Sequence, residues 1–333
     1  MTQPEVKIFE SRAKLMVSGE YLVLKGALSL ALPLKFGQKL SVQVREGKSM
    51  IVWNSMIQDK PWFTATIQLP DFRVTATNLP EISETLRQIL MAAKKLNPDF
   101  LQYDQEYLVT AELDFNPAWG IGSSSSLISN IADWAGCEPF ILNSRIFNGS
   151  GYDIACARST SPIIYRTEEN RPFFRPAYFQ PHFHRHLYFV YLNRKQDTRK
   201  SIGETDLSNV STSDIETISG LTLRMEATPN LMDFQSLMDL HEEITGKIIH
   251  KTPVRQLLFN DFPGSIKSLG SWGGDFILAV SDLPEVYVRN YFTQNNLTTI
   301  FNYNEIVSRQ ELADHSLLPS DDWEHKRLIQ NLS

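Results

Sequence analysis

Apolar and polar residues alternate in short segments along the first seventy residues, which predicts a β-rich amino-terminal region. Residues 40–45 show the two-residue period of a strand with one buried face. The expected strands cover residues 6–9, 14–17, 19–24, 28–34, 40–45, 51–53 and 62–69. A β-sheet is therefore expected to precede the first helix.

The period then changes to that of a helix. Asn78 to Glu81 form a helix start with Pro80 in its first turn, and the helix should end near residues 97–98. Its apolar face consists of Ile82, Leu86, Ile89 and Leu90. Residues 107–115 alternate again and predict a strand. This strand leads into a glycine- and serine-rich turn and a short helix from Ser124 to about Ala135.

A second glycine-rich turn at residues 147–155 precedes an expected strand at 162–166. Residues 171–186 are rich in proline and aromatic side chains, and we place a domain boundary there. The elements expected beyond it are a buried strand at 187–192, two or three helices within 201–249 with breaks at Gly220 and Pro229, a third glycine turn at 267–275 leading into a strand, a helix at 284–295 and a strand at 297–303.

Composition narrows the possible functions. The chain has 333 residues, long enough for two domains, and 42% of them are hydrophobic. A formal charge of -6 argues against a nucleic-acid surface, which needs a clustered basic face. The sequence shows neither a signal-peptide core nor a membrane-spanning apolar run, so we expect a cytoplasmic protein without a membrane partner. Two cysteines, Cys137 and Cys156, are too few for a disulfide scaffold, and we expect both to be buried.

The turn at residues 116–126 has the composition of an anion site. Gly120 and Gly122 permit backbone paths closed to other residues, and Ser123 and Ser124 stand where a helix begins. The first turn of a helix has backbone N–H groups without acceptors and carries the positive end of the helix dipole. The turn therefore predicts a binding site for phosphate.

Three segments together resemble the motifs of the GHMP kinases, the family of galactokinase, homoserine, mevalonate and phosphomevalonate kinases. The first lies around Lys14 and Gly19-Glu20-Tyr21, the second at residues 117–124, and the third at residues 270–275. Within the third, Trp272 departs from the family's glycine-rich pattern. The resemblance implies an α+β two-domain GHMP kinase fold. Its amino domain, residues 1–180, would be of the ribosomal protein S5 domain 2-like type and its carboxyl domain, residues 181–333, ferredoxin-like.

The same resemblance implies a small-molecule kinase that uses ATP and Mg²⁺. Asp153 matches the family's catalytic aspartate, Lys14 the lysine that accompanies it, and Ser124 the serine that reaches Mg²⁺. The residues implied at the nucleotide are Pro117, Gly120, Ile121, Gly122, Ser123, Ser124, Ser125, Gly270, Gly273 and Gly274. The residues expected at the substrate are Glu20, Tyr21, Ser150, Gly151, Lys195 and Arg199.

Two departures from the family pattern bear on the metal. The segment between Ser124 and Asp153 is short, and the family's magnesium-binding glutamate falls near Leu142. Glu138 and Asp133 are the acids nearby, so either one replaces that glutamate or Mg²⁺ is held by Ser124, phosphate and water.

Within the family, the motifs of this chain most resemble those of the mevalonate and phosphomevalonate kinases. The resemblance therefore implies mevalonate or phosphomevalonate as the acceptor. Two alternatives remain open: a nucleotide-binding protein of this fold without catalysis, and a decarboxylase of the diphosphomevalonate type. A homodimer is compatible with the sequence. His182, His184 and His186 alternate and would share one strand face, for which we favour a solvated or aromatic-packed edge over a metal site.

Overall fold

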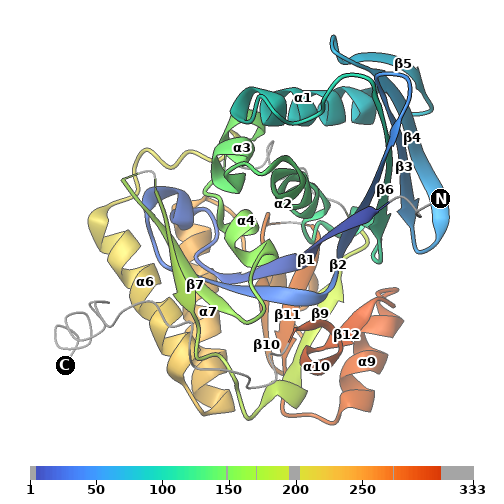
Figure 1. Ribbon diagram of the computed structural model, residues 1–333. Coiled ribbons are helices and arrows are strands. Elements are labelled where there is room, and N and C mark those ends of the chain that lie inside the picture. The colour runs from blue at the N-terminus through green and yellow to red at the C-terminus, as the bar shows by residue number, and fades with distance from the viewer. Residues whose placement is uncertain (1–4, 148, 170, 195–202, 273, 309–333) are drawn as a thin grey trace.

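The computed structural model describes residues 5–308 except 148, 170, 195–202 and 273 (Figure 1). Its strands are β1 (Val6–Ser18), β2 (Ser29–Glu46), β3 (Met50–Ile57), β4 (Lys60–Gln68), β5 (Arg73–Thr77), β6 (Gln105–Leu113), β7 (Ile163–Glu168), β8 (Arg171–Pro176), β9 (Leu187–Tyr191), β10 (Ser265–Ser268), β11 (Phe276–Val280) and β12 (Ile300–Asn302). Its α-helices are α1 (Pro80–Leu96), α2 (Ser123–Ala135), α3 (Pro139–Ile146), α4 (Tyr152–Ala157), α6 (Thr212–Ala227), α7 (Leu231–Ile248), α8 (Val254–Leu258), α9 (Glu285–Gln294) and α10 (Tyr303–Ile306). Short 3-10 helices are η1 (Leu22–Lys25), η2 (Pro117–Trp119) and η3 (His184–His186).

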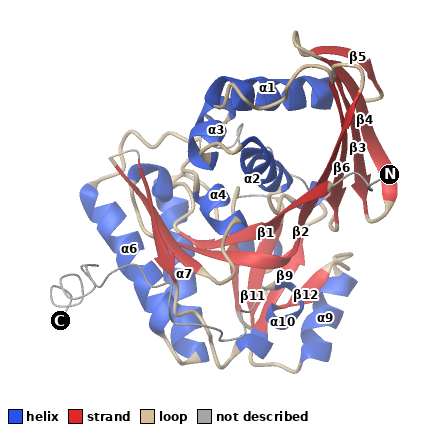
Figure 2. Cartoon of the chain, in the orientation of Figure 1, coloured by secondary structure: helices blue, strands red, loops and turns tan. Residues whose placement is uncertain are grey.

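The strands form two sheets, and helices lie beside both (Figure 2). The larger sheet has the order β5-β4-β3-β6-β2-β7-β8, with β1 paired to β2, and the smaller has the order β10-β11-β9-β12. Strands β3 and β6 pair in parallel, and the chain between them passes through α1, as a parallel connection requires. The other strand pairs are antiparallel.

Strand β2 is shared by two parts of the larger sheet. Its beginning, Ser29 to Ala31, pairs with β7, and its second part, Gln38 to Glu46, pairs with β6. Strand β1 pairs with β2 along most of its length, with register shifts on both sides of Lys14. Such irregularities in a ladder re-aim side chains, and here they surround a residue predicted to be catalytic.

The hydrophobic core also joins the two halves of the chain. One cluster contains Leu30 and Leu32 of β2 together with Phe189 of β9, Leu278 of β11 and Phe234 of α7. Near the end of the described chain, α10 packs against β2, and a backbone bridge joins Leu34 to Val307. A second cluster lies between the larger sheet and helices α1, α2 and α3.

Both faces of the smaller sheet are buried. Phe189 and Leu278 face the cluster shared with β2, whereas Val190 and Ile277 face a separate cluster that includes Phe292 of α9. Successive strand residues point to opposite faces, so a strand covered on both sides needs a continuous apolar run. The run at residues 187–192 was predicted as a buried strand for this reason, and β9 confirms it.

The predicted α+β fold class is confirmed, and so are the helices seen as α1, α2 and α9. Residues 19–24 were wrongly predicted as strand: they form a turn and η1, with Tyr21 at φ 60°. Gly220 does not break a helix and lies within α6. The predicted strand at 297–303 is shorter, since β12 is followed at once by α10.

Two predictions on single side chains are also corrected. His184 and His186 do not share a strand face, because they belong to η3, where the Nδ1 atoms lie 3.1 Å from Pro181 O and 2.9 Å from Ser281 O, respectively. Cys156 is buried as expected, but Cys137 is only partly buried.

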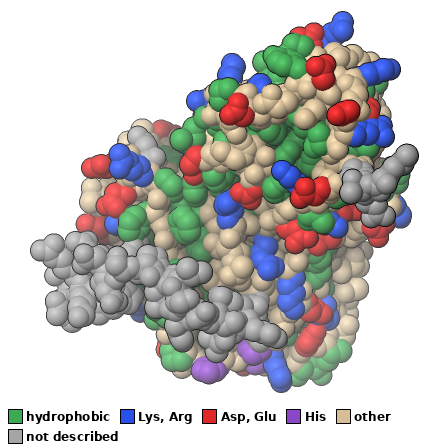
Figure 3. All heavy atoms as spheres, viewed as in Figure 1, with side chains coloured by type: hydrophobic (Ala, Val, Ile, Leu, Met, Phe, Trp, Pro, Cys, Tyr) green, Lys and Arg blue, Asp and Glu red, His purple; other side chains and the backbone are tan. Residues whose placement is uncertain are grey.

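On the face of the molecule drawn in Figure 3, acidic and basic side chains are intermixed and do not form a large area of one charge. Within the described ranges, no helix is long and apolar enough to span a bilayer.

Candidate active site

The glycine- and serine-rich turn forms the entry to α2. Asn116 caps η2 by accepting a hydrogen bond from Ala118 N–H at 2.9 Å, and Gly120 ends it at φ 70°. Gly122, at φ 102°, is the residue immediately before α2. Both glycines occupy the left-handed region, which other residues adopt at a cost, so the chain can reverse here and begin a helix within three residues.

The first turn of α2 leaves hydrogen-bond donors available. Within the described residues, the N–H groups of Ser123 and Ser124 donate to no protein acceptor. Ser124 is exposed, while the Ser125 and Ser126 hydroxyls donate back to Gly122 O at 3.0 Å. The geometry therefore gives this 13-residue helix an amino end that can accept an anion.

Lys14 and Asp153 form an ion pair beside this turn. Lys14 Nζ lies 2.8 Å from Asp153 Oδ1, and the two side chains are 13% and 33% exposed. Lys14 N–H donates to Ile121 O at 2.8 Å, and a methyl group on Gly122 would lie 3.1 Å from Lys14 Cε. Lys14 is therefore in direct contact with the predicted phosphate loop, and it joins Asp153 to that loop.

Tyr152 completes this group. Lys14 Nζ donates a hydrogen bond to the Tyr152 hydroxyl oxygen at 2.7 Å. Burial alone would lower the pKa of Lys14, but the charge of Asp153 and the contacts with Tyr152 hold that pKa above its ordinary value. Burial raises the pKa of the Tyr152 hydroxyl. Lys14 is thus a permanent cation and Tyr152 a neutral hydroxyl at physiological pH.

The second glycine turn orients Asp153 from α4. Gly151, at φ 85°, precedes α4, and Tyr165 donates a hydrogen bond from its hydroxyl to Ser150 O. A methyl group on Gly151 would lie 3.2 Å from both Phe140 and the Tyr165 hydroxyl. Ser150 and Gly151 therefore hold the turn before Asp153 in place.

The third glycine turn lies against the loop at residues 117–125 through the side chain of Asp275. Asp275, at φ 52°, is 6% exposed, and its N–H donates to Arg194 O at 2.7 Å. A methyl group on Gly120 would lie 2.5 Å from Asp275 Cγ, so the carboxylate fills the space beside this glycine. Burial, and then the charge of Asp275, raises the pKa of Tyr191, whose hydroxyl donates to Ala118 O at 2.9 Å.

Glu20 lies in a buried polar cluster rather than at an open surface. Its carboxylate accepts a hydrogen bond from Lys267 Nζ, and the two side chains are 1% and 0% exposed. Glu242 lies 3.7 Å from the same ammonium, and His241 Nε2 accepts from Gly19 N–H at 3.0 Å. The first motif is therefore fastened to β10 and α7 of the carboxyl half.

Tyr21 and Trp272 make a second connection between the first and third motifs. The backbone N–H of Trp272 donates to the Tyr21 hydroxyl oxygen at 3.2 Å, and both side chains are buried. The Trp272 ring packs on α7, where a methyl group on Gly246 would lie 3.2 Å from it. Trp119 also packs in the core, with its ring 5.3 Å from that of Phe301. Both tryptophans pack against hydrophobic side chains of the core.

The structure thus brings together Lys14, Asp153, the loop at residues 117–125 and the third turn. Gly270, at φ 62°, begins that turn, and Gly274 is buried within it. Ile121 is fully buried and supports the loop from the core. Lys195, Arg199 and Gly273 lie outside the described residues.

Three residues of this region were missed by the sequence analysis. Tyr152 was not predicted as a partner of Lys14, although the adjacent Asp153 was. Asp275 was treated as the end of a glycine motif, and its acidic character was the signal that could have identified it. Lys267 gave no local signal, because its partner Glu20 is 247 residues away.

The oxygen donors at the loop fit Mg²⁺. The Ser124 hydroxyl is exposed at the first turn of α2 and, within the described part of the chain, makes no hydrogen bond to protein. Mg²⁺ prefers oxygen ligands and retains several waters, which an exposed hydroxyl beside an anion site permits. Among the described residues, no group of three or more His, Cys, Asp or Glu side chains could hold a metal ion without other ligands.

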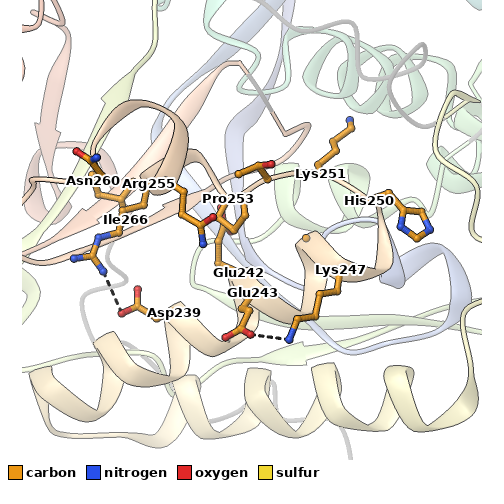
Figure 4. A pocket seen from close by; sticks show the side chains of 13 residues that line it. Asp239, Glu242, Glu243, Lys247, His250, Lys251, Pro253, Arg255, Asn260 and Ile266 are labelled. Carbon is orange, nitrogen blue, oxygen red and sulfur yellow. Dashed lines mark hydrogen bonds and ion pairs between the residues drawn. The ribbon is translucent and has the colours of Figure 1, made fainter.

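A hollow of about 850 Å³ lies elsewhere, along the carboxyl end of α7 (Figure 4). Two ion pairs lie along it: Lys247 with Glu243 at 2.7 Å and Arg255 with Asp239 at 3.8 Å. Among the described residues, none of those predicted for the site lines this hollow. The candidate site is therefore defined by the glycine turns and not by this depression.

Comparison with solved structures places the fold. No protein-family model matches the chain, and no curated protein matches it by sequence. Mevalonate kinase from L. major in complex with R-mevalonate is similar in structure, with a TM-score of 0.65 at 14% identity, over 94% of this chain and 100% of that one. Phosphomevalonate kinase from Streptococcus pneumoniae in complex with phosphomevalonate and AMPPNP gives a TM-score of 0.63 at 15% identity, over 87% and 97%.

Galactokinase from Lactococcus lactis complexed with galactose gives a TM-score of 0.61 at 13% identity, over 87% of this chain and 89% of that one. These structures share the α+β architecture over 87% or more of this chain. The protein therefore has the fold of the GHMP kinases.

Proposed function

We propose that this protein is a small-molecule kinase that transfers the γ-phosphoryl group of ATP to an acceptor hydroxyl or phosphate. The observation that carries the proposal is the Lys14–Asp153 ion pair of 2.8 Å, placed against the amino end of α2. Phosphoryl transfer requires positioning and neutralisation of spreading negative charge more than covalent help. A cation, a carboxylate and free backbone donors in contact meet those requirements.

Each residue has a role in this proposal. The N–H groups of Ser123 and Ser124 bind phosphate oxygens at the start of α2. Asp153 accepts the proton of the acceptor hydroxyl, and Lys14 stabilises charge on the transferred group. Tyr152 holds the Lys14 ammonium in position through its hydroxyl oxygen. Mg²⁺, when bound, neutralises phosphate charge, and Ser124 would hold it.

Mevalonate and phosphomevalonate are the proposed acceptors. The support is twofold: the Gly19-Glu20-Tyr21 and Gly151-Tyr152-Asp153 motifs resemble those of the mevalonate branch, and two structural neighbours are complexes with R-mevalonate and with phosphomevalonate. Galactokinase shares the fold at a similar TM-score, so the acceptor has to be identified by assay.

The test is an ADP-release assay with ATP and Mg²⁺ over mevalonate, phosphomevalonate, homoserine and galactose. Asp153→Asn should lower turnover of the preferred acceptor by about 100-fold or more, since a general base contributes that much. Asp133→Asn is the matched control, because Asp133 forms an equally short 2.8 Å pair with Arg158 at the other end of α2. Full turnover in the Asp153→Asn variant would refute the proposed role.

One observation favours a second candidate, a nucleotide-binding protein without catalysis. The residue near the family's magnesium-binding glutamate is Leu142, which is fully buried in the core and supplies no ligand. This candidate predicts that calorimetry detects ADP binding, while no ADP is released from ATP in the presence of any of the four acceptors.

A third alternative is a decarboxylase, which release of carbon dioxide from diphosphomevalonate would identify.

A further inference from the structure

We propose that the Tyr152 hydroxyl donates a hydrogen bond to the phosphoryl group during its transfer, which makes Tyr152 a catalytic residue as well as a support for Lys14. The inference rests on the proposed kinase function and adds one contact to it. It gives a role to the residue directly before Asp153, to which the family resemblance assigned none.

The Lys14 ammonium and the Tyr152 hydroxyl each have a hydrogen-bond donor to spare. A lysine ammonium has three N–H donors. Two oxygens lie against that of Lys14: Asp153 Oδ1 at 2.8 Å and the Tyr152 hydroxyl oxygen at 2.7 Å. Tyr152 accepts in this contact, so its own hydroxyl hydrogen points elsewhere, and among the described residues it meets no acceptor. Two oriented donors are therefore left for a ligand.

Lys14 carries these donors to the phosphate loop. Its side chain passes Gly122, where a methyl group would lie 3.1 Å from both Lys14 Cγ and Lys14 Cε. Gly122 immediately precedes α2, and the N–H groups of Ser123 and Ser124 donate to no acceptor in the described chain. The ammonium is one bond beyond Cε, so the Tyr152 hydroxyl that it contacts lies next to the proposed phosphate site.

Tyr152 is held in place before any ligand binds. It is the first residue of α4, and its ring packs against the cluster that contains Met16 and Cys156. The Lys14 ammonium lies 5.0 Å from the centre of this ring. Burial raises the pKa of the Tyr152 hydroxyl, so the hydroxyl keeps its proton. A fixed donor of this kind stabilises developing charge without having to reorganise.

The chemistry of the transfer decides where this donor is useful. The acceptor oxygen forms a bond to the γ-phosphorus of ATP while the bond from that phosphorus to the β,γ-bridging oxygen breaks, and ADP leaves with the bonding pair. When the acceptor is a hydroxyl, its proton passes to Asp153, which is 33% exposed and can be reached. Tyr152 keeps its own proton throughout.

During this step negative charge spreads over the equatorial oxygens of the transferred group. A hydrogen bond from Tyr152 to one of these oxygens strengthens as the charge develops, and so it lowers the barrier. A hydrogen bond to the attacking oxygen would instead hold back the electron pair that forms the new bond. The transferred phosphoryl group is therefore the partner that the chemistry favours.

The first experiment compares Tyr152→Phe with the unmodified protein in the ADP-release assay, using ATP, Mg²⁺ and the preferred acceptor. Turnover should fall at least about tenfold, while the KM values of ATP and acceptor stay within about twofold, because the contact forms in the transition state. Tyr291→Phe is the matched control, since it removes a tyrosine hydroxyl that donates to Asp261 Oδ1 at 2.6 Å from α9. It should keep full turnover.

A second experiment separates a direct contact from support of Lys14. Aluminium fluoride bound with ADP and Mg²⁺ imitates the transferred phosphoryl group, so its affinity can be measured by calorimetry without turnover. In the Lys14→Met background, Tyr152→Phe should weaken this binding again by about tenfold and leave binding of ADP alone unchanged. A residue that acted through Lys14 alone would have no further effect in that background.

Two results would overturn the inference and leave the proposed function standing. One is a Tyr152→Phe variant with the turnover of the unmodified protein. The other is equal affinity for ADP with aluminium fluoride in Lys14→Met and in the double variant. Absence of ADP release by the unmodified protein with every acceptor would refute the kinase function itself, and the aluminium fluoride series would still test the Tyr152 contact.

Discussion

Lys267 donates a hydrogen bond to Glu20 inside the protein, across 247 residues of chain, and the two side chains are 0% and 1% exposed. The pair joins the end of the first motif to the strand that leads into the third. Lys267 also donates to Ser268 O at 2.9 Å, and Glu242 accepts from Ser268 N–H at 3.0 Å. The third glycine turn therefore begins from a position fixed by buried charges.

Replacing Lys267 should be severely destabilising. Lys267→Met would leave the Glu20 and Glu242 carboxyls buried without their cation, at a cost of about 3–5 kcal/mol in the free energy of unfolding. Glu20→Gln together with Lys267→Met should recover part of that loss, because one of the two uncompensated carboxyls is removed. Denaturant titration of both single variants and the double variant measures the coupling. Additive losses would show that the pair does not interact as described.

The stability of this cluster should depend on pH. Burial raises the pKa of Glu20 to about 7, although Lys267 lowers it in part, and Glu242 also has a raised pKa because of burial. The folded state then holds the Glu20 proton more tightly than the unfolded state does. The resulting stabilisation is complete below about pH 4.5 and is lost as the pH rises through 7.

Glu20→Gln removes this contribution, so the stability of the unmodified protein should fall by on the order of 1–3 kcal/mol more than that of the variant between pH 4.5 and 8. Burial, and then the charge of Lys267, lowers the pKa of His241, which gives the opposite slope below pH 6.5 in both proteins. Glu243→Gln, which alters an exposed pair with Lys247, is the control. Parallel pH profiles for Glu20→Gln and the unmodified protein would contradict the prediction.

Gly120 should tolerate substitution less well than another glycine of the same backbone conformation. Gly120→Ala combines a φ of 70° with a contact 2.5 Å from Asp275 Cγ, whereas Gly270→Ala has a φ of 62° and nothing within 4 Å. Both should lose about 1 kcal/mol from the left-handed conformation, and Gly120→Ala about 1–3 kcal/mol more from overpacking. Thermal or denaturant unfolding distinguishes them. Equal losses would mean that the Asp275 carboxylate does not press on the loop.

Lys14 should matter for turnover far more than for folding. Lys14→Met removes the cation 2.8 Å from Asp153, and turnover should fall by about 100-fold or more in the ADP-release assay. Asp153 is 33% exposed, so water can replace part of the lost interaction, and the midpoint of unfolding should change little. Lys247→Met, from an exposed helical pair, is the control. An active Lys14→Met variant would remove Lys14 from the mechanism.

Local patterns in the sequence predicted much of the fold. The helix α1 was predicted because its apolar positions recur at helical spacing and Pro80 stands at its start. The turn before α2 was predicted because two glycines precede a run of serines, and Gly120 and Gly122 do adopt positive φ. These features depend on neighbouring residues, so the sequence alone carries them.

Features that depend on distant partners were not predicted. Glu20 was placed in a continuing strand and at the substrate, but its environment is set by Lys267 and α7, which no local period reveals. Asp275 was absorbed into a glycine motif, although its contact with Gly120 comes from the return of the chain after β9 and β10. The pairing of Lys14 with Asp153 followed from the family resemblance and not from spacing.

Strand β2 has a consequence for any attempt to divide the protein. It pairs with β7 at one end and β6 at the other, while Val307 returns to Leu34 near its middle. A fragment that stops at residue 180 would keep this strand but expose the apolar side chains that Phe189 and Leu278 cover. Two separately produced halves should therefore be insoluble alone and should recover a folded state only when they are made together in the same cell.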